Sequence, residues 1–169
     1  MKKLSLNLSS FIIIILFSIS FSYSDENNIT KGKAIVVDGD TIKIKGEQIR
    51  FGGIDAPESY YRGKKQTCIK DNKKFFCGQI SKDKLIERIG NNSLNCIIEK
   101  KKDKYKRNIG TCYLKNKNIN KWLVRNGYAI AYKRYSKKYI LDEKYAKESK
   151  LGIWKGTFIK PEKWRRIMN

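Results

Sequence analysis

Three carboxylates, Asp40, Asp55 and Glu58, flank strand-like segments in the stretch DGDTIKIKGEQIRFGGIDAPE. Asp40 begins one segment, and Asp55 and Glu58 follow the end of the next. A meander of three strands would bring these acids to one edge of a sheet. Clustered carboxylates repel one another unless a cation or a shared proton compensates. Oxygen ligands without His or Cys are typical of Ca²⁺ or Mg²⁺ sites, so the stretch predicts a hard-cation site assembled from two loops.

Arg50 adds a phosphate-binding group to this cluster, because it precedes Asp55 by five residues on the same strand-like segment. An arginine can neutralise a phosphate through paired hydrogen bonds, although an isolated arginine often only pairs an acid for structure. We interpret Asp38 and Glu47 as turn residues. The sequence contains no His, which excludes Ser-His and Cys-His nucleophile systems and histidine-based phosphodiesterases. Metal-assisted phosphodiester hydrolysis is therefore the leading hypothesis.

The composition indicates a single basic domain. The chain has 169 residues, with 38 Lys and Arg against 16 Asp and Glu, and a net charge of +22. That length allows one domain with a substantial core. The charge predicts an anionic partner: nucleic acid, anionic lipid or an acidic polymer.

The N-terminus resembles a secretory signal. Lys2 and Lys3 precede an unbroken apolar run at residues 11–17, and Ser22-Tyr23-Ser24 offers small residues for cleavage. The run is short for a membrane span, although an uncleaved anchor is the alternative. Removing two lysines of the 38 basic residues leaves 36 against 16 acids, a net charge of +20. We expect residues 1–24 to be a signal peptide and the protein to be secreted or periplasmic, without a stable membrane partner after cleavage.

Four cysteines, Cys68, Cys77, Cys96 and Cys112, remain in the exported part. An even number in an exported domain predicts disulfides, and three pairings are open. Cys68 and Cys77 would close a short lysine-rich loop, and Cys96 and Cys112 lie on strand-like segments around a lysine-rich turn. We expect those two pairs.

The chain is predicted to be an α+β protein. Strands are expected at residues 33–37, 41–45, 48–54, 94–99 and 108–114, and helices at 79–89, 119–125 and 139–150. A long basic loop covers 59–76. Five strands with a helix after the third fit the five-stranded OB-fold β-barrel, here followed by two C-terminal helices. We divide the chain into residues 25–32, a flexible segment, 33–156, the OB-fold domain, and 157–169, a basic tail.

Four segments of residues 33–156, VVDGDTIKI…IRFGGIDAPES, DKYKR, WLVRNGYA and GIW, resemble the staphylococcal-nuclease-like, or thermonuclease, family. The Cys68–Cys77 loop resembles that of exported, cysteine-containing members of the family. The resemblance agrees with an OB-fold. It implies a Ca²⁺-dependent endonuclease that hydrolyses DNA and RNA with little sequence preference, in which water attacks phosphorus in line and the 5′ oxygen departs.

The resemblance also implies a role for each matching residue. Asp40, Asp55 and the backbone carbonyl of Ala56 correspond to the calcium ligands, and Glu58 to the residue that positions or deprotonates water. Arg50 and Arg107 correspond to the two arginines that bind phosphate. The substrate contacts correspond to Lys104, Tyr105, Tyr132 and Tyr135. The family usually has Gly before the second arginine, whereas this chain has Lys106, so the turn that directs Arg107 can differ.

Two other classes of protein share part of this pattern. A non-catalytic OB-fold module that binds nucleic acid would need the basic surface but not the acids, which weaken affinity for phosphate. A basic protein that binds anionic surfaces would leave the acids unexplained. The full set of Asp40, Arg50, Asp55, Glu58 and Arg107 favours a nuclease, which we expect to be a monomer.

Overall fold

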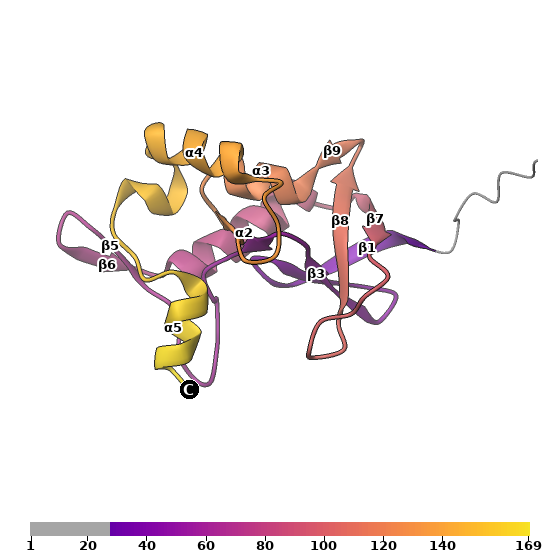
Figure 1. Cartoon of the computed structure of the whole chain (residues 1–169), viewed down its shortest axis with the longest axis horizontal. Coiled ribbons are helices and arrows are strands. Elements are labelled where there is room, and N and C mark those ends of the chain that lie inside the picture. The colour runs from indigo at the N-terminus through magenta and orange to yellow at the C-terminus, as the bar shows by residue number, and fades with distance from the viewer. Residues whose placement is uncertain (1–27) are drawn as a thin grey trace, which may run out of the picture.

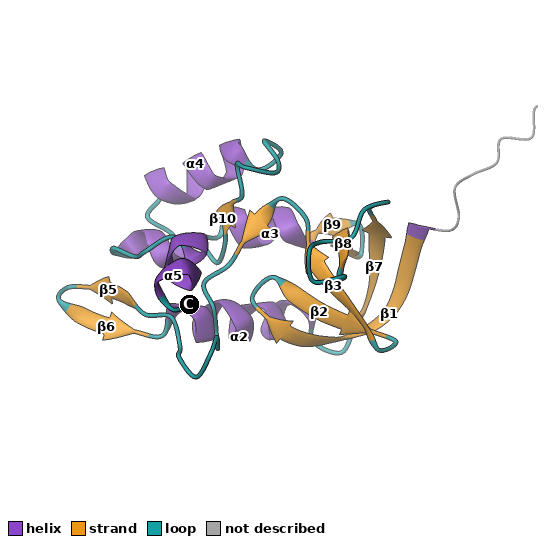
Figure 2. Ribbon diagram, turned by 60° about the horizontal axis from the view of Figure 1, so that its bottom comes forward, coloured by secondary structure: helices purple, strands orange, loops and turns teal. Residues whose placement is uncertain are grey.

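The computed structural model describes residues 28–169. Four antiparallel strand pairings and one parallel pairing close a small barrel. Its strands are β1 (Ile29–Asp38), β2 (Thr41–Ile44), β3 (Glu47–Phe51), β7 (Ser93–Ile98) and β8 (Asn108–Leu114). They pair in the order β3-β2-β1-β7-β8, and the parallel pairing of β3 with β8 closes the circle. The predicted OB-fold barrel is therefore confirmed (Figures 1 and 2).

The strand boundaries differ from the expected ones by more than one residue at two places. The strand expected at 48–54 is divided into β3 and the short β4 (Ile54–Asp55), because Gly53 takes a φ of 74° that breaks the extended backbone. β1 begins at Ile29, inside the segment expected to be flexible, because Ile29 to Lys33 pair with β7. The predicted signal peptide, residues 1–24, lies outside the described residues.

Helices cover the barrel on the side that carries the acids. They are α2 (Cys77–Ile89), α3 (Ile119–Arg125), α4 (Ile140–Glu148), the 3₁₀ turn η3 (Gly152–Lys155) and α5 (Pro161–Ile167). α5 is a third helix after the barrel, where the sequence predicted two helices and a tail. Pro161 at its first turn and the buried Trp164 stabilise it. None of the described helices is both long and apolar enough to cross a membrane.

Short strands extend this framework. β9 (Lys117–Asn118) pairs with β8, and β10 (Ile130–Ala131) pairs with β4. β5 (Cys68–Lys70) and β6 (Lys73–Phe75) form a hairpin within the segment expected to be a loop. In both ribbon views this hairpin lies at the end of the molecule opposite the start of β1 (Figures 1 and 2).

Both expected disulfides are present. Cys96 and Cys112 face each other in the β7–β8 register and are buried in the main core with side chains such as Ile42, Leu85 and Leu123. Cys68 and Cys77 join the β5–β6 hairpin to the start of α2, in a second apolar cluster that includes Ile130 and Ile153. The Cys96–Cys112 bond therefore crosslinks the barrel, and the Cys68–Cys77 bond fixes the loop that follows Glu58 to α2.

Candidate active site

The first three strands bring the acids together as the meander predicts. Asp40 lies in the β1–β2 turn, and its backbone carbonyl accepts a 2.8 Å hydrogen bond from the amide of Phe51 at the end of β3. Asp55 lies on β4, which follows directly. Both side chains are almost completely buried. Two anionic groups therefore share one edge of the barrel.

Arg50 joins these acids. Its Nη1 donates to Asp40 Oδ1 at 2.8 Å, and its Nη2 donates to Asp55 Oδ1 at 2.7 Å. Arg50 is opposite Thr41 in the β2–β3 register, which places its side chain beside the turn that carries Asp40. Burial opposes the charge of Arg50, but Asp40 and Asp55 outweigh it and raise its pKa. Arg50 is therefore cationic at all working pH values.

The loop after Asp55 is fastened to the β1–β2 turn by backbone donors. The Ala56 amide donates to Asp40 Oδ2 at 3.1 Å, and the Ser59 amide donates to Asp38 Oδ1 at 3.0 Å. Asp38 also accepts from the Gly39 amide at 2.7 Å. The turn role predicted for Asp38 thus extends to holding the segment around Glu58.

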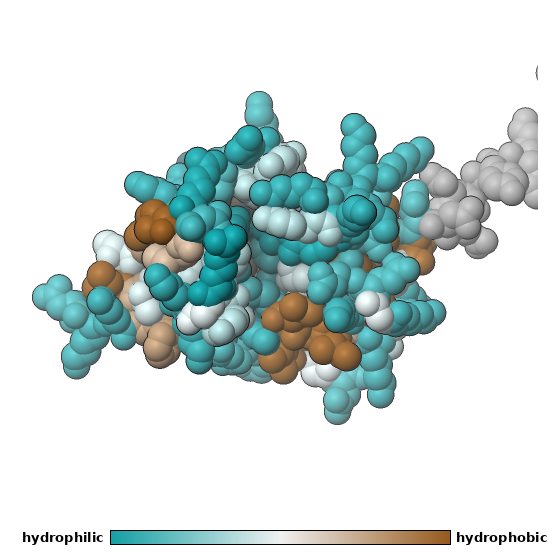
Figure 3. Space-filling model, turned by 90° about the horizontal axis from the view of Figure 1, so that it is seen from below, coloured by the Kyte–Doolittle hydropathy of each residue, from teal (hydrophilic) through white to brown (hydrophobic). Residues whose placement is uncertain are grey.

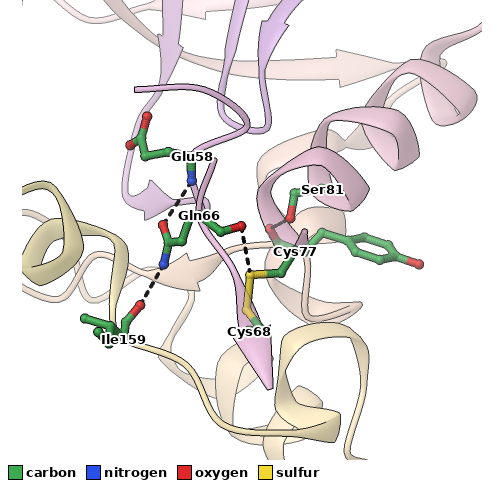
Figure 4. Close-up of a disulfide and its surroundings, with 7 residues drawn as sticks. Glu58, Gln66, Cys68, Cys77, Ser81 and Ile159 are labelled. Atoms are coloured by element: carbon green, nitrogen blue, oxygen red, sulfur yellow. Dashed lines mark hydrogen bonds between the residues drawn. A yellow bond between two sulfur atoms is a disulfide. The ribbon is translucent and has the colours of Figure 1, made fainter. Parts of the chain in front are cut away.

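Glu58 is positioned by contacts that begin at the Cys68–Cys77 disulfide (Figure 4). Gln66, which is fully buried, accepts from the Glu58 amide at 3.1 Å and donates to the Ile159 carbonyl at 2.8 Å. At Gly78, on α2, a side chain would come within 1.9 Å of the Glu58 carbonyl oxygen, so only glycine allows this approach. The Glu58 backbone is therefore fixed between α2 and the segment leading to α5.

Arg165 is the site residue that sequence reasoning missed. From α5 its Nη2 donates to both carboxylate oxygens of Asp55, at 2.9 and 3.1 Å, and its Nη1 forms an ion pair with Glu58. Arg165 and Asp55 are separated by 110 residues. The pair Arg165-Arg166 was visible as a basic tail, but nothing in the spacing indicates that α5 returns to the barrel edge.

Together these residues leave a surplus of negative charge. Burial and the charge of Asp40 raise the pKa of Glu58 to about 8, against the opposing effect of Arg165. Burial also raises the pKa of Asp55, partly offset by Arg165, and burial with the charge of Asp40 raises that of Asp38. Burial is the largest cause in each case, and the two guanidinium groups only partly offset it; four carboxyl groups, Asp38, Asp40, Asp55 and Glu58, stand against Arg50 and Arg165.

The donor set fits a hard cation, although the acids do not converge on one point. Within residues 28–169, no group of three or more His, Cys, Asp or Glu side chains is arranged to hold a metal. Guanidinium groups lie between the acids instead: Arg50 between Asp40 and Asp55, and Arg165 between Asp55 and Glu58. A divalent cation would supply the missing positive charge, and carboxylate oxygens are its preferred ligands. A divalent cation on Asp55 would have to replace Arg165, which donates to both of its oxygens.

Arg107 does not contact the acids. Its Nε donates to Asp103 Oδ2 at 2.7 Å, its Nη2 lies 2.7 Å from the same oxygen in an ion pair, and its guanidinium lies 5.3 Å from the centre of the Tyr105 ring. Lys106 adopts the left-handed conformation, with a φ of 62°, so the turn keeps the shape that glycine would give it. The structure thus directs Arg107 towards its own loop. A hollow of 240 Å³ beside Glu47 is lined by Arg107, Lys106 and Tyr105.

The other predicted substrate contacts fall into two groups. Tyr132 lies close to the acids, because its amide donates to the Gly53 carbonyl at 2.9 Å, and burial with the charge of Asp55 raises its pKa to about 12. Its ring meets the exposed Tyr135 edge to face at 4.7 Å. Lys104 lies over the ring of Tyr105 at 4.9 Å, on the same loop as Arg107.

Comparisons with known proteins agree with this geometry. Residues 48–156 match the family model described as "Staphylococcal nuclease homologue". An uncharacterized endonuclease of Haemophilus influenzae is 30% identical over 162 residues, covering 91% of this chain and 82% of that protein.

Two further relatives cover less of their own length. The succinoglycan biosynthesis protein ExoI of Rhizobium meliloti is 32% identical, covering 73% of this chain and 64% of ExoI. Endonuclease YncB of Bacillus subtilis is 30% identical, covering 75% of this chain and 61% of YncB. The chain thus spans less than two thirds of these two proteins. With the barrel, the paired acids and Arg50 in place, the matches show that this chain belongs to the staphylococcal nuclease family.

Proposed function

We propose that this protein is an exported, Ca²⁺-dependent endonuclease that hydrolyses phosphodiester bonds of DNA and RNA with little sequence preference. The observation that carries the proposal is the pairing of Arg50 with both Asp40 and Asp55, beside Glu58. The family is one of nucleases, and the endonuclease names of two relatives agree with hydrolysis. The metal, the substrates and export are the parts that the proposal adds.

Each side chain has a task in this chemistry. Asp40, Asp55 and the carbonyl of Ala56 would hold Ca²⁺, which when bound polarises a phosphoryl oxygen and orients the attacking water. Arg50 donates to the phosphate and stabilises the charge that develops as water attacks in line. Glu58 orients that water or accepts its proton, for which it must lie within hydrogen-bond reach and be ionised. The 5′ oxygen then departs.

Substrate binding falls to two groups of aromatic and basic side chains, one beside the acids and one on the loop that carries Arg107. Tyr132 and Tyr135 offer faces on which a base can stack, and Lys104 and Tyr105 extend the surface on the opposite loop. Arg107 would supply the second guanidinium after releasing Asp103. Without residues 1–24 the chain has 36 Lys and Arg against 16 Asp and Glu, and this net charge of +20 draws a polyanion to the surface whatever its base sequence. We expect the protein to act as a monomer.

Incubating the purified protein with single- and double-stranded DNA and RNA, with Ca²⁺ or with a chelator, tests the proposal. We expect cleavage of all four with Ca²⁺, and none with the chelator. Cleavage that persists after chelation would contradict the metal mechanism. Binding of nucleic acid without any cleavage would indicate the non-catalytic binding module instead.

A further inference from the structure

Arg165 occupies the carboxylates that a divalent cation would need. Asp55 is completely buried, and both of its oxygens accept hydrogen bonds from Arg165, while Arg50 donates to one of them. Glu58 also faces α5 and forms an ion pair with the guanidinium of Arg165. One side chain of α5 therefore pairs with two acids that lie about a hundred residues earlier in the chain.

We propose that Arg165 is an internal competitor of the divalent cation, so that α5 inhibits the site until the cation displaces this side chain. The inference rests on the metal dependence proposed above. A guanidinium that donates to both oxygens of Asp55 lies too close for a dication on the same oxygens, because like charges repel strongly at such distances in a buried site. The two cations must therefore alternate.

The structure provides a way for Arg165 to leave without unfolding α5. The helix is held by other residues: Trp164 is buried and meets Tyr61 edge to face at 6.2 Å, and Tyr61 donates to Asn169 at 2.7 Å. Arg134 also pairs with Glu162 at 3.2 Å. The Arg165 side chain retains 21% exposure, so rotation about its own bonds leads it towards solvent. A competing cation needs to move one side chain, not the helix.

Arg165 therefore sets the concentration of Ca²⁺ at which the site fills. A ligand that binds only the open form has its apparent affinity reduced by the fraction of molecules that are open. If Arg165 leaves the acids in about one molecule in ten or fewer, its removal tightens Ca²⁺ binding about tenfold or more. The effect concerns binding and precedes any catalytic step.

Calorimetric titration with Ca²⁺, without nucleic acid, tests this inference. We expect Arg165→Ala to bind Ca²⁺ about tenfold more tightly than the unchanged protein, and Arg165→Lys to lie between them. Arg166→Ala is the matched control, because Arg166 is the next residue of α5 and pairs only with Glu162 among the described residues. Its affinity should be unchanged. Circular dichroism identifies any variant that does not fold.

The outcomes separate this inference from the proposed function. Equal affinities in the unchanged protein and both Arg165 variants, or weaker binding in Arg165→Ala, would overturn the competition while leaving a calcium nuclease intact. No Ca²⁺ binding in any folded variant would overturn both. If Arg165→Ala does not fold, Arg165→Lys alone decides, because it keeps one charge but loses the paired donors.

A cavity of 580 Å³ lies between the β5–β6 hairpin, α2 and η3. Five lysines line it, Lys70, Lys73, Lys74, Lys84 and Lys155, with Asp71 the only acid in the lining. The lining also includes the apolar and aromatic side chains of Phe75, Ile80, Tyr128 and Ile153.

We infer that this cavity, which we call the hairpin pocket, is a second binding site for single-stranded nucleic acid. Lysines together with aromatic and aliphatic side chains offer charges for phosphates and a surface for a base, as in proteins that bind single strands without sequence preference. Lys73 and Lys74 are exposed and form no ion pair within residues 28–169. The inference rests on nucleic acid being the substrate.

Length-dependent binding tests the hairpin pocket. Affinities for two oligothymidylates, of about 30 and about four nucleotides, are measured in a chelator, which prevents cleavage. The long probe can reach the catalytic edge and the hairpin pocket at once, whereas the short probe can occupy only one of them at a time. We expect Lys73→Glu with Lys74→Glu to weaken binding of the long probe about tenfold, since about two phosphate contacts are lost, and to leave the short probe unchanged. The control is Lys144→Glu with Lys150→Glu, at exposed lysines in and after α4, which changes the net charge by the same amount.

Equal loss with both pairs of reversals would overturn the hairpin pocket and indicate a general charge effect. Equal loss for the long and short probes would overturn it as well. If the unchanged protein binds neither probe, the proposed substrate class fails together with the pocket.

Discussion

Glu58 shows how one residue connects stability and chemistry at this site. Its pKa is raised from 4.5 to about 8, by burial first and then by Asp40. The folded state therefore holds this proton more tightly than the unfolded chain does. The resulting stabilisation is fully present below about pH 4.5 and is lost as the pH rises through about 8.

We therefore expect the metal-free protein to lose stability between about pH 4.5 and 8, as measured by urea unfolding in a chelator. Glu58→Gln cannot ionise, so its stability should fall less steeply over that range. The stability of this variant should still fall with pH, because the pKa values of Asp38 and Asp55 are also raised. Glu148→Gln, at an exposed residue of α4, is the control and should follow the unchanged protein. An identical slope in all three would mean that Glu58 is ionised throughout.

The same substitution tests catalysis. If Glu58 orients or deprotonates water, Glu58→Gln should slow cleavage by a factor of about 10² to 10⁴. Binding of an uncleaved oligonucleotide, measured by fluorescence anisotropy, should stay within a few-fold of the unchanged protein. A parallel loss of binding and cleavage would assign Glu58 to structure.

Residues near one another in the sequence were predictable, and distant ones were not. Asp40, Arg50, Asp55 and Glu58 lie within one short meander, so strand period and turns suffice to bring them together. Arg165 reaches Asp55 across 110 residues, and only the packing of α5 brings it there. The contact of Arg107 with Asp103 is local. That Arg107 pairs with Asp103 and not with the acids of the site depends on tertiary geometry, which the spacing of residues does not specify.

The elements follow the same distinction. β8 and α3 have the bounds expected from the sequence, because alternation in one and a clear apolar stripe in the other specify them locally. β4 and β10 are two residues each and exist only because they pair with each other, which no local signal predicts. The β5–β6 hairpin turns at Asp71 and Asn72, which both have positive φ, and the disulfide from Cys68 to Cys77 joins it to α2.

The two disulfides should have separable effects. Cys68 and Cys77 lie beside Gln66, which holds the Glu58 amide, so Cys68→Ala with Cys77→Ala should lower kcat several-fold. Cys96 and Cys112 lie in the barrel core, so Cys96→Ala with Cys112→Ala should cost about 2–5 kcal/mol of unfolding free energy and leave kcat unchanged below the transition. Cleavage rates and urea unfolding of both double variants measure this difference. Equal losses of kcat would show that the first disulfide does not act through the Glu58 loop.

At the scale of the whole molecule, the acids and the basic surface act at different distances. The buried acids carry charge only where a cation or guanidinium compensates it, whereas the exposed lysines create a positive field around the molecule. Figure 3 shows hydrophilic side chains over most of one face, with apolar atoms confined to patches. Attraction of nucleic acid is therefore a property of the surface, and hydrolysis a property of one barrel edge.

This division predicts that salt acts on binding and not on the chemical step. A logarithmic plot of the affinity of Glu58→Gln for single-stranded DNA against salt should have a slope between about −2 and −4, which corresponds to roughly three to six phosphate contacts. The kcat of the unchanged protein at saturating substrate and Ca²⁺ should vary little over the same range, because buried ion pairs such as Arg50 with Asp55 are weakly screened. A flat binding plot would mean that the surface charge does not recruit substrate. A kcat that falls in step with affinity would place a salt-sensitive surface contact in the catalytic step itself.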